Sequence, residues 1–499
     1  MAEQGYQIGM VGLGVMGRNL LLNMADHGFS GMGYDTDQSK VQLLRHEAGE
    51  RRIEGAASLP EFMGGLSSPR AIMMLVPAGP PVDAVIRALM PHLEPGDLLI
   101  DGGNSYFKDT ELRAATLAER GVQFLGVGIS GGENGARHGA SLMPGGAREA
   151  YERVRPILEA VAARVPVVPS GLAVAAASTD AEAGLSPNGA AHDQAELCVA
   201  YMGPGGAGHY VKMVHNGIEY ALMELIAESY DIMSRALGLT DEELEAVYRR
   251  WNEGELNSYL IEITANIFGK VDERTGKRLV DVILDQAGQK GTGKWTSQSA
   301  MDLGVPAPTV DAAVSMRDLS ALKDEREQAA QILHGPQRAY RGERPRVLHQ
   351  LHNALYVGMA SAYAQGLALL RAASQSFHYD LKLEEVARIW RGGCIIRSAM
   401  LEPIRAAYSA QPDLPNLLLD QQLGWEVMAR QPDLRAIIRS TVGLGISIPG
   451  LSAALAYFDG YRSAWLPANL IQAQRDYFGA HTYERIDEKG VFHTHWSED

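Results

Sequence analysis

Cysteine is scarce in this 499-residue chain, which contains only Cys198 and Cys394. The two lie far apart and match neither a disulfide framework nor the ligand spacing of a zinc site. We therefore expect a reducing compartment and no metal centre. Long apolar runs are also missing, because no stretch reaches the roughly 18 residues of a membrane-spanning helix. Residues 1–5 do not resemble a secretory signal, so a cytoplasmic location is expected.

Positive charge is likewise in deficit. The chain has 45 basic and 60 acidic side chains, a formal net charge of −15. This balance argues against nucleic acid or an anionic membrane as the main partner. A small anionic substrate would need a local cationic pocket. The length and the 46% of hydrophobic residues are enough for roughly two to four domains.

A glycine-rich turn follows the first predicted strand, residues 8–11. It reads Gly12-Leu13-Gly14-Val15-Met16-Gly17 and leads into a helical pattern. This order is typical of a dinucleotide-binding unit, in which the glycines permit a tight turn, close approach of the pyrophosphate and helix packing. Asp35 follows at about the distance of 20 residues expected for a carboxylate that binds ribose hydroxyls. A turn-forming Asp before Thr36-Asp37 is the alternative.

Further apolar runs at 71–76, 98–100 and 122–125 follow helical stretches. This alternation predicts a parallel sheet with helices on both faces. Ligands bind at the carboxyl ends of such strands, which here carry residues 77–79, 101–105 and 130–132. Ordinary loops are the alternative for each of these segments alone. The Ala-, Ser- and Gly-rich segment 171–196 is interpreted as a mobile surface insertion without an assigned role.

The predicted helix 210–220 carries a polar stripe on an otherwise apolar circumference. Lys212, His215, Asn216 and Glu219 occupy positions i, i+3, i+4 and i+7, within an arc of about 100°. A solvated face would show the same spacing. The stripe, however, combines an amine, an imidazole, an amide and a carboxyl group, a mixture that suits proton transfer better than solubility.

The segment around this stripe is repeated. The His-Asn pair at 215–216 recurs 137 residues later at 352–353, and each copy is followed by a tryptophan, Trp251 and Trp390. The copy has His349 in place of Lys212 and Tyr356 in place of Glu219. A packing role should have preserved all four positions, so the loss favours a chemical role for Lys212 and Glu219. Chance similarity is the alternative.

Two more stretches are unusual. Residues 288–296 are glycine-rich and basic but lack the spacing of a nucleotide P-loop, so we reject ATP binding and expect a phosphate cradle. Residues 467–477 predict a helix that begins at a proline and is followed by a glycine. This predicted helix contains Arg475, and His481 follows shortly after its end. In the tail 490–499, Phe492 and Trp496 have no local core, which predicts packing on a partner subunit.

These features predict three parts. Residues 1–200 form an α/β Rossmann-type domain, a doubly wound parallel sheet that contains the insertion 171–196. Residues 201–465 form an all-helical, internally duplicated domain. Residues 466–499 form a C-terminal helix and tail that pack on the partner subunit.

Along nearly its whole length the chain resembles the 6-phosphogluconate dehydrogenases, decarboxylating enzymes of the β-hydroxyacid dehydrogenase superfamily. The matching stretches are 12–17, 101–105, 130–133, 212–220, 289–296 and 466–483. The resemblance implies metal-independent oxidative decarboxylation of 6-phospho-D-gluconate to D-ribulose 5-phosphate and CO2, with reduction of NAD or NADP, in the pentose phosphate pathway. It also assigns substrate binding and dimerisation to residues 201–465 and implies a homodimer that exchanges its C-terminal tails.

The resemblance assigns roles to individual residues. Lys212 would be the general base and Glu219 the general acid, with His215 and Asn216 beside the substrate. The other substrate-binding residues would be Asn104, Ser130, Gly131, Gly132, Tyr220, Lys290 and Arg317, with Arg475 and His481 from the other subunit. The cofactor would contact Gly12, Leu13, Gly14, Val15, Met16, Gly17, Asp35, Thr36, Val76, Pro77, Ala78 and Asn104. For Lys212 to accept a proton near pH 7, burial and neighbouring cations must lower its pKa from about 10.4.

The chain departs from the family pattern where the 2′-phosphate of NADP would bind. Most members have Asn-Arg-Thr at positions 35–37, where this chain has Asp-Thr-Asp, and Pro77 replaces a common lysine. We therefore expect a preference for NAD over NADP. Two other functions are considered: oxidation of a smaller β-hydroxyacid without phosphate, and a dinucleotide-binding protein without catalysis. Lys290, Arg317 and Arg475 argue against the first, and Lys212 and Glu219 against the second.

Overall fold

The computed structural model describes residues 5–167, 195–336 and 340–496. By compactness the chain separates into two units, Met1–Ala454 and Leu455–Asp499, which are described separately. The boundary expected between residues 200 and 201 lies inside the first unit and stays a prediction. Within the described residues, no helix has both the length and the apolar character needed to cross a membrane.

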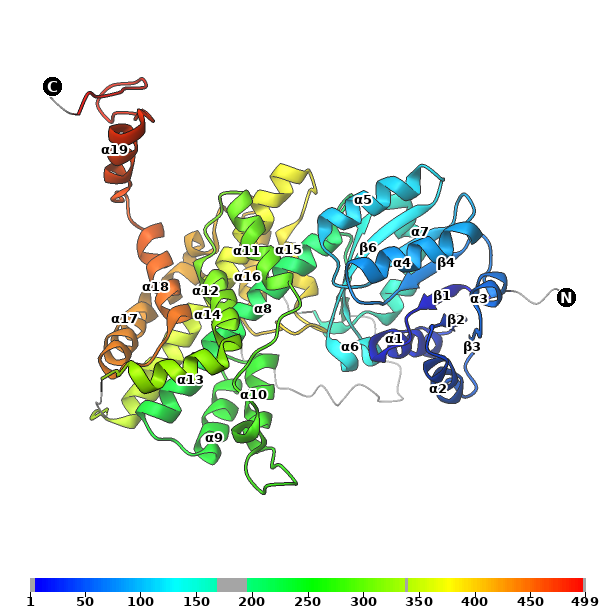
Figure 1. Ribbon diagram of the computed structural model, residues 1–499, viewed down its shortest axis with the longest axis horizontal. Coiled ribbons are helices and arrows are strands. Elements are labelled where there is room, and N and C mark those ends of the chain that lie inside the picture. Colours follow the sequence, from blue (N-terminus) through cyan, green and yellow to red (C-terminus); the bar gives the residue numbers. More distant parts are fainter. Residues whose placement is uncertain (1–4, 168–194, 337–339, 497–499) are drawn as a thin grey trace. The chain divides into compact units, whose positions relative to one another are not determined.

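A seven-stranded sheet forms the N-terminal part of the first unit, in the order β3-β2-β1-β4-β5-β6-β7 (Figure 1). The strands are β1 (Ile8–Val11), β2 (Gly31–Tyr34), β3 (Ile53–Gly55), β4 (Ala71–Met74), β5 (Leu98–Asp101), β6 (Gln123–Ser130) and β7 (Ser141–Gly146). Neighbouring strands from β3 to β6 are parallel, as predicted, whereas β7 is antiparallel to β6. The connection before β7, residues 131–140, is shorter than the dozen or more residues that a parallel crossover needs.

Helices cover both faces of this sheet, as expected for a doubly wound fold. One buried core joins side chains of β1 to α1 (Val15–Asp26), α2 (Gln38–Ala48) and α7 (Arg148–Val161). The other core joins side chains of β4 to α3 (Leu59–Gly65), α4 (Pro80–Leu89) and α5 (Phe107–Ala118). Consecutive residues Ile72 and Met73 enter opposite cores, because side chains alternate across a strand.

The predicted insertion 171–196 lies outside the described residues except for Ala195 and Glu196. These two open β9 (Ala195–Leu197), which pairs with β8 (Arg164–Pro166) in a small antiparallel sheet. Glu196 forms ion pairs with Arg391 and, at 2.9 Å, with Arg405. The chain that leaves the insertion is therefore attached to the helical part of the same unit.

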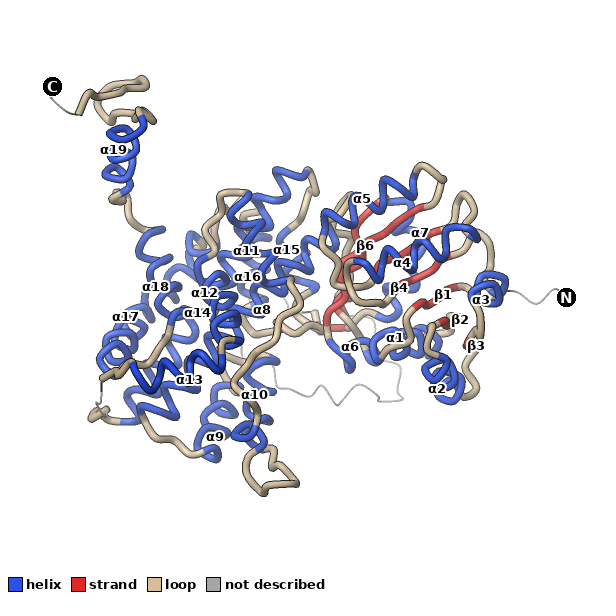
Figure 2. Tube along the Cα trace, viewed as in Figure 1, coloured by secondary structure: helices blue, strands red, loops and turns tan. Residues whose placement is uncertain are grey.

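The rest of the first unit is mainly helical, as Figure 2 shows. Its helices include α8 (Ala207–Asp231), α9 (Asp241–Asn252), α10 (Tyr259–Gly269), α11 (Thr292–Asp302), α12 (Pro308–Ala321), α13 (Lys323–Ile332), α14 (Arg344–Phe377), α15 (Leu383–Ile389), α16 (Leu401–Ala410) and α17 (Gln421–Leu444), and α18 (Pro449–Tyr461) begins here. The long helices α8 and α14 pack against each other, and α17 packs against α14.

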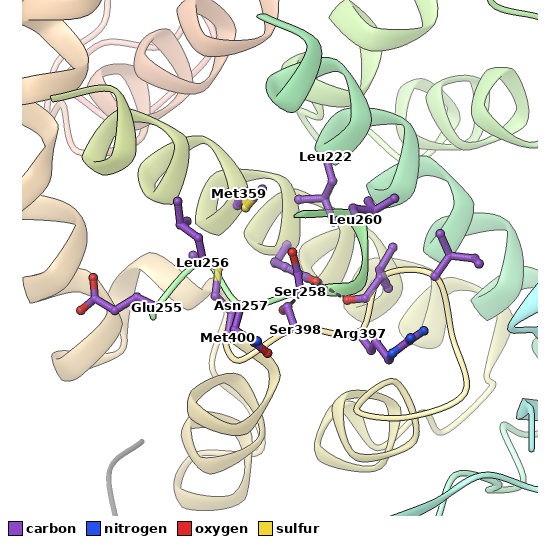
Figure 3. A pocket seen from close by; sticks show the side chains of 13 residues that line it. Leu222, Glu255, Leu256, Asn257, Ser258, Leu260, Met359, Arg397, Ser398 and Met400 are labelled. Atoms are coloured by element: carbon purple, nitrogen blue, oxygen red, sulfur yellow. Dashed lines mark hydrogen bonds between the residues drawn. The ribbon is translucent and has the colours of Figure 1, made fainter. Parts of the chain in front are cut away.

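Ring contacts between the two copies of the repeat are reciprocal. His215 of the first copy lies 5.5 Å from Trp390 of the second, and His352 of the second lies 5.8 Å from Trp251 of the first, both edge-to-face. Ser258 of the first copy and Ser398 of the second form an antiparallel β-bridge between the two copies. The pocket in Figure 3 is lined by both copies there, including Leu222 and Met359, which are also 137 residues apart. This pseudo-symmetry supports the duplication inferred from the sequence.

The second unit contains α19 (Ala468–Gly479) and the tail that follows it. Tyr483 and Phe492 pair through two backbone hydrogen bonds of 2.8 Å. The buried carboxylate of Asp476 accepts hydrogen bonds from the indole of Trp496 at 2.8 Å and from His493 at 2.9 Å. Phe492 and Trp496, for which no local core was expected, nevertheless have local partners, because the tail folds back onto α19. Sequence spacing does not reveal such a return.

Candidate functional site

Helix α8 lies directly against the sheet, and this contact positions the site. A Cβ atom on Gly208 would fall 2.3 Å from the carbonyl oxygens of Gly126 in β6 and Met143 in β7. Only glycine permits so close an approach of a helix to two strands. One turn later, a Cβ on Gly128 would fall 2.5 Å from Cβ of Lys212. The first part of the polar stripe therefore faces strand β6.

Three residues of the stripe form a buried hydrogen-bonded cluster. Nζ of Lys212 donates to Oδ1 of Asn216 at 2.7 Å and lies 3.4 Å from Nδ1 of His215. Lys212 is 5% exposed, Asn216 8% and His215 0%. The alternative of a solvated face is excluded for these side chains. Charged or polar groups this deeply buried need partners, and each has them here.

Ser130, at the end of β6, joins this cluster to the dinucleotide half. Its Oγ lies 3.2 Å from Nε2 of His215 and accepts a hydrogen bond from the amide of Ile395 at 3.4 Å. Ser130 itself is 2% exposed. Gly131 and Gly132 follow directly and have positive φ angles. The predicted substrate loop 130–132 therefore meets the polar stripe of α8.

Glu219 and Tyr220 extend the site by one more turn of α8. The carboxylate of Glu219 lies 3.7 Å from Nδ1 of His215, and 21% of its side chain is exposed. The Arg317 guanidinium sits 4.3 Å from the ring centre of Tyr220 and donates to the carbonyl of Gly288 at 2.9 Å. This contact brings the glycine-rich segment 288–291, which includes the exposed Lys290, to the same end of the stripe.

Burial changes the proton affinities of the stripe. It lowers the pKa of Lys212, although the nearby Glu219 opposes the shift. It raises the pKa of Glu219, against the effects of Lys212 and Arg317. Burial and the charge of Lys212 lower the pKa of His215 well below 6.5, so its ring is neutral at pH 7. Desolvation thus favours the uncharged amine and the protonated carboxyl group, the forms needed by a base and an acid.

Two sets of contacts with the stripe were not predicted from the sequence, although the segment 288–296 was expected to form part of the site. Thr292 accepts a hydrogen bond from the Asn216 amide at 3.1 Å, and Thr296 donates to the carbonyl of Met213 at 2.8 Å. From the second copy of the repeat come Ile395, whose amide bonds to Ser130, and the buried Cys394. Residue periodicity within α8 carries no signal for contacts made across such distances along the chain.

The glycine turn has the geometry that a dinucleotide needs. Gly12 has a φ of +96°, and a Cβ there would fall 2.4 Å from the carbonyl oxygen of Leu75. A Cβ on Gly17 would fall 2.0 Å from the carbonyl oxygen of Gly12, which explains the close helix packing. Beside Gly14 no atom lies within 4 Å of such a position. This open space next to the start of α1 fits a pyrophosphate that contacts backbone amides.

The end of β2 is acidic. Asp35 accepts hydrogen bonds from the amides of Leu13 at 2.8 Å and Asp37 at 2.9 Å, so its carboxylate holds the turn and retains free lone pairs. Asp37 is exposed and caps α2 through Ser39. Lys40 lies 3.5 Å from Asp35 and 4.0 Å from Asp37. The nearby cation is therefore shared between two carboxylates.

The remaining predicted residues lie on loops of the first unit or in the second unit. Asn104 is exposed on the loop after β5, and Val76, Pro77 and Ala78 form the loop after β4. Arg475 and His481 are exposed and belong to the second unit. Their roles stay predictions. Among the described residues, no group of three His, Cys, Asp or Glu side chains is arranged to hold a metal ion.

Comparisons with known proteins cover both halves of the chain. Residues 7–169 match the family model described as the NAD binding domain of 6-phosphogluconate dehydrogenase, and residues 208–496 match that of its C-terminal domain. The NADP(+)-dependent, decarboxylating 6-phosphogluconate dehydrogenase of Bacillus subtilis is 51% identical over 98% of this chain and 99% of its own length. A decarboxylating 6-phosphogluconate dehydrogenase of Lactococcus lactis is 47% identical over 99% of both chains. Among solved structures, the chain is similar to the Plasmodium falciparum 6-phosphogluconate dehydrogenase, which was solved in its apo form, with NADP+ and with 6-phosphogluconate. The TM-score is 0.87 and the sequence identity 42%, over 98% of this chain and 100% of that chain.

Proposed function

Because this chain belongs to the 6-phosphogluconate dehydrogenase family, we propose that it oxidises and decarboxylates 6-phospho-D-gluconate, yielding D-ribulose 5-phosphate, CO2 and a reduced nicotinamide dinucleotide. The observation that carries the proposal is the buried amine of Lys212, which shares one polar stripe with the carboxyl group of Glu219. The two Cα atoms are about 10 Å apart along α8, so the groups can act on different carbons of one sugar acid.

The first step requires Lys212 in its uncharged form. Its amine takes the proton of the hydroxyl on carbon 3 as that carbon loses a hydride, which leaves a 3-keto acid and a lysine ammonium. The bound nicotinamide dinucleotide supplies the hydride acceptor. Asn216, which accepts a hydrogen bond from Nζ at 2.7 Å, holds the amine in place. A positioned base of this kind contributes about 10²- to 10⁴-fold to a rate.

In the second step the Lys212 ammonium donates its proton to the ketone oxygen as the bond between carbons 1 and 2 breaks. CO2 leaves and an enediol remains. Glu219 then gives a proton to the former carbon 2, while Lys212 takes back the enol proton to form the ketone. One proton must return from Lys212 to Glu219 in each cycle. Nδ1 of His215 lies 3.4 Å from the amine and 3.7 Å from the carboxylate, between the two.

We infer that the sugar acid spans the site from Ser130 to Arg317. Ser130 and the backbone of Gly131 and Gly132 would hold the carboxylate and hydroxyls, with Asn104 beside them. Tyr220, Arg317 and Lys290 would hold the phosphate, and the partner's tail would add Arg475 and His481. Arg317 is already fixed by the Tyr220 ring and the Gly288 carbonyl. A pre-positioned guanidinium suits a phosphate, whereas a short acid without phosphate has no use for it.

Mixing the purified protein with 6-phosphogluconate and either dinucleotide tests the proposal against its two alternatives. We expect reduced nicotinamide and CO2 in equal amounts. Reduced nicotinamide without CO2 would indicate a non-decarboxylating hydroxyacid dehydrogenase. Dinucleotide binding without reduction would indicate a protein that has lost catalysis.

We propose that NAD is preferred over NADP, although the Bacillus subtilis relative is NADP(+)-dependent. The support is local: a 2′-phosphate at the end of β2 would face Asp35 and Asp37, while Lys40 is already engaged by both. The hydrogen bonds on Asp37 lower its pKa, so it is charged at pH 7. Like charges without a compensating cation disfavour NADP.

The cofactor preference predicts the effect of restoring the common family residues. In Thr36→Arg combined with Asp37→Thr, a guanidinium can pair with the 2′-phosphate, so kcat/KM for NADP should rise about 10- to 100-fold, the range of one or two charged hydrogen bonds. Thr36→Gln with Asp37→Thr is the control, because it adds length and removes the carboxylate without adding charge. Steady-state kinetics give kcat/KM for NAD and for NADP in the wild type and in both variants, and so measure the preference. A wild-type enzyme that already prefers NADP contradicts the proposal.

We propose a homodimer in which the second unit completes the partner's site. The support is the apolar surface of this unit, since Phe478, Ile486 and Val491 are 72%, 89% and 69% exposed. Surfaces of this kind mark interfaces.

Mixing two inactive variants tests the tail exchange. Lys212→Arg lacks the base, and Arg475→Ala lacks the arginine that the tail would supply to the other subunit. If tails are exchanged, a mixed dimer has one site with both native residues. After denaturation and refolding of an equal mixture, activity should recover to about a quarter of wild type, because half of the dimers are mixed. Activity that stays at the average of the two parents contradicts the exchange.

A further inference from the structure

His209 lies on α8 one turn before Lys212, and the chemistry described above does not use it. It is 1% exposed. Its Nε2 lies 3.1 Å from the carbonyl oxygen of Asp101, and its Nδ1 lies 2.6 Å from Oγ1 of Thr110. A carbonyl oxygen only accepts, so Nε2 carries the proton and Nδ1 accepts from the Thr110 hydroxyl. Burial lowers the pKa of His209, which keeps the ring neutral and this tautomer in place.

Asp101 connects this bond to the loop that follows β5. It is the last residue of the strand, and its carboxylate is completely buried. One carboxylate oxygen accepts from the amide of Gly103 at 3.0 Å and the other from the hydroxyl of Ser105 at 2.6 Å. Asp101 thus shapes the loop that presents Asn104 and, through its own carbonyl, holds α8.

Arg113 extends the same network to the loop after β4. Its guanidinium donates to the carbonyl of Gly79 at 3.2 Å and to Asp83 at 2.7 Å, and lies 3.6 Å from the carboxylate of Asp101. Arg113 therefore links the loop after β4 to Asp101, and His209 links Asp101 to α8. The loops after β4 and β5 both carry residues expected to contact the dinucleotide.

Backbone contact fixes how near α8 lies to the sheet, but it does not by itself fix how the helix is turned. Gly208 is in contact with β6 and β7, and a Cβ on Gly126 would fall 2.7 Å from the His209 ring. The directional bond from His209 to Asp101 constrains this rotation from the side of the sheet, while Tyr210 bonds to Ser299 and the Met213 carbonyl to Thr296 on α11. Lys212 is three residues after His209, about 60° away on the same face of the helix.

We propose that His209 is a positioning residue that holds the catalytic helix in register with loop 101–105 and so sets the distance from the Lys212 amine to the reacting carbon. The inference rests on the proposed function. Misplacement of a reacting group by about 1 Å can cost about 10²-fold in rate, even when binding is intact.

His209→Leu and His209→Gln test the proposal with Ser229→Ala as a matched control. Leucine removes the donor, whereas glutamine can place an amide N–H near the position of Nε2. Ser229 is buried on the same helix about 25 Å beyond Lys212, and its hydroxyl bonds to Tyr248 at 2.8 Å. The readouts are kcat, the dissociation constants of both ligands, the melting temperature, and the isotope effect with 6-phosphogluconate deuterated at carbon 3.

We expect His209→Leu to lower kcat about 10²-fold and to raise the isotope effect, because hydride transfer becomes limiting, with dissociation constants changed by less than about threefold. His209→Gln should recover most of kcat. Ser229→Ala should lower the melting temperature and leave kcat and the isotope effect unchanged. Wild-type kcat in His209→Leu, or a loss of activity with an unchanged isotope effect, overturns the proposal.

Thr110→Val covers the case in which His209→Leu does not fold. It keeps the ring and its bond to the Asp101 carbonyl but removes the hydroxyl that bonds to Nδ1, so the ring loses one of its two anchors. A lower kcat with a raised isotope effect supports the positioning role, and wild-type values of both overturn it. The wild-type enzyme is measured first with 6-phosphogluconate. If it shows no turnover, the proposed function itself has failed and this inference fails with it.

Discussion

Lys212→Arg should bind 6-phosphogluconate and lose about 10²- to 10⁴-fold in kcat, the range that a positioned base contributes. Arginine keeps a cation near the substrate, but a guanidinium with a pKa above 12 does not become neutral at working pH. The lysine amine does so more readily, because burial lowers its pKa. Steady-state kinetics and substrate binding by calorimetry separate the two effects. Substantial turnover in the variant would remove the base assignment.

A matched control and the pH profile sharpen this result. Lys108→Arg changes an exposed lysine that pairs with Asp302 at 3.6 Å and should leave kcat unchanged.

In the wild type, kcat/KM should fall at low pH as Lys212 gains its proton and at high pH as Glu219 loses its proton. Because the pKa of Lys212 is lowered and that of Glu219 is raised, both the acidic and the basic limb of the pH profile should lie closer to neutral pH than ordinary values would place them. The two apparent pKa values read from the profile describe Lys212 and Glu219 as an interacting pair and not each residue alone.

Glu219→Gln should lower kcat by about 10²- to 10⁴-fold through a different step. The amide has no acidic proton to give to the enediol, but hydride transfer, which depends on Lys212, is left in place. Rapid mixing should therefore show a burst of reduced nicotinamide in the first turnover, followed by slow steady-state turnover. The absence of a burst, with hydride transfer itself slowed to the steady-state rate, would contradict the assignment of Glu219 to the later step.

Glu224→Gln is the control for this variant. Glu224 lies on the same helix five residues further on, and burial raises its pKa to about 7. It shares the helix, the chemical group and the desolvation of Glu219, but has no assigned role in the stripe. Its substitution should leave both the burst amplitude and kcat close to wild type. A loss equal to that of Glu219→Gln would show that any buried carboxyl group on this helix produces the effect.

Local features were predictable from the sequence because they depend on periodicity and turn chemistry. The stripe from Lys212 to Glu219 follows from helical spacing, and the open position at Gly14 follows from the glycine turn. The antiparallel direction of β7 was missed, although the short connection that causes it is visible along the chain.

Long-range contacts were not predictable. Thr292 reaches Asn216 from 76 residues away, and Ile395 reaches Ser130 from 265 residues away. The glycine-rich pattern of 288–296 marks the segment of Thr292 but not its partner, and no local pattern marks Ile395. Each contact depends on how separate helices pack. The burial of Asp476 was missed for the same reason, since its partners arrive from a tail that folds back along α19.

The proposed mechanism depends most directly on the proton affinity of Lys212. Carbon-13 NMR of the wild-type enzyme labelled at the lysine ε-carbon can follow this titration, with the Lys212 resonance identified by its loss in Lys212→Arg. We expect a pKa below the ordinary value of about 10.4, because the side chain is 5% exposed and burial lowers its pKa. A pKa at or above that value would contradict the mechanism, because the amine would then be charged when the hydroxyl proton has to be taken.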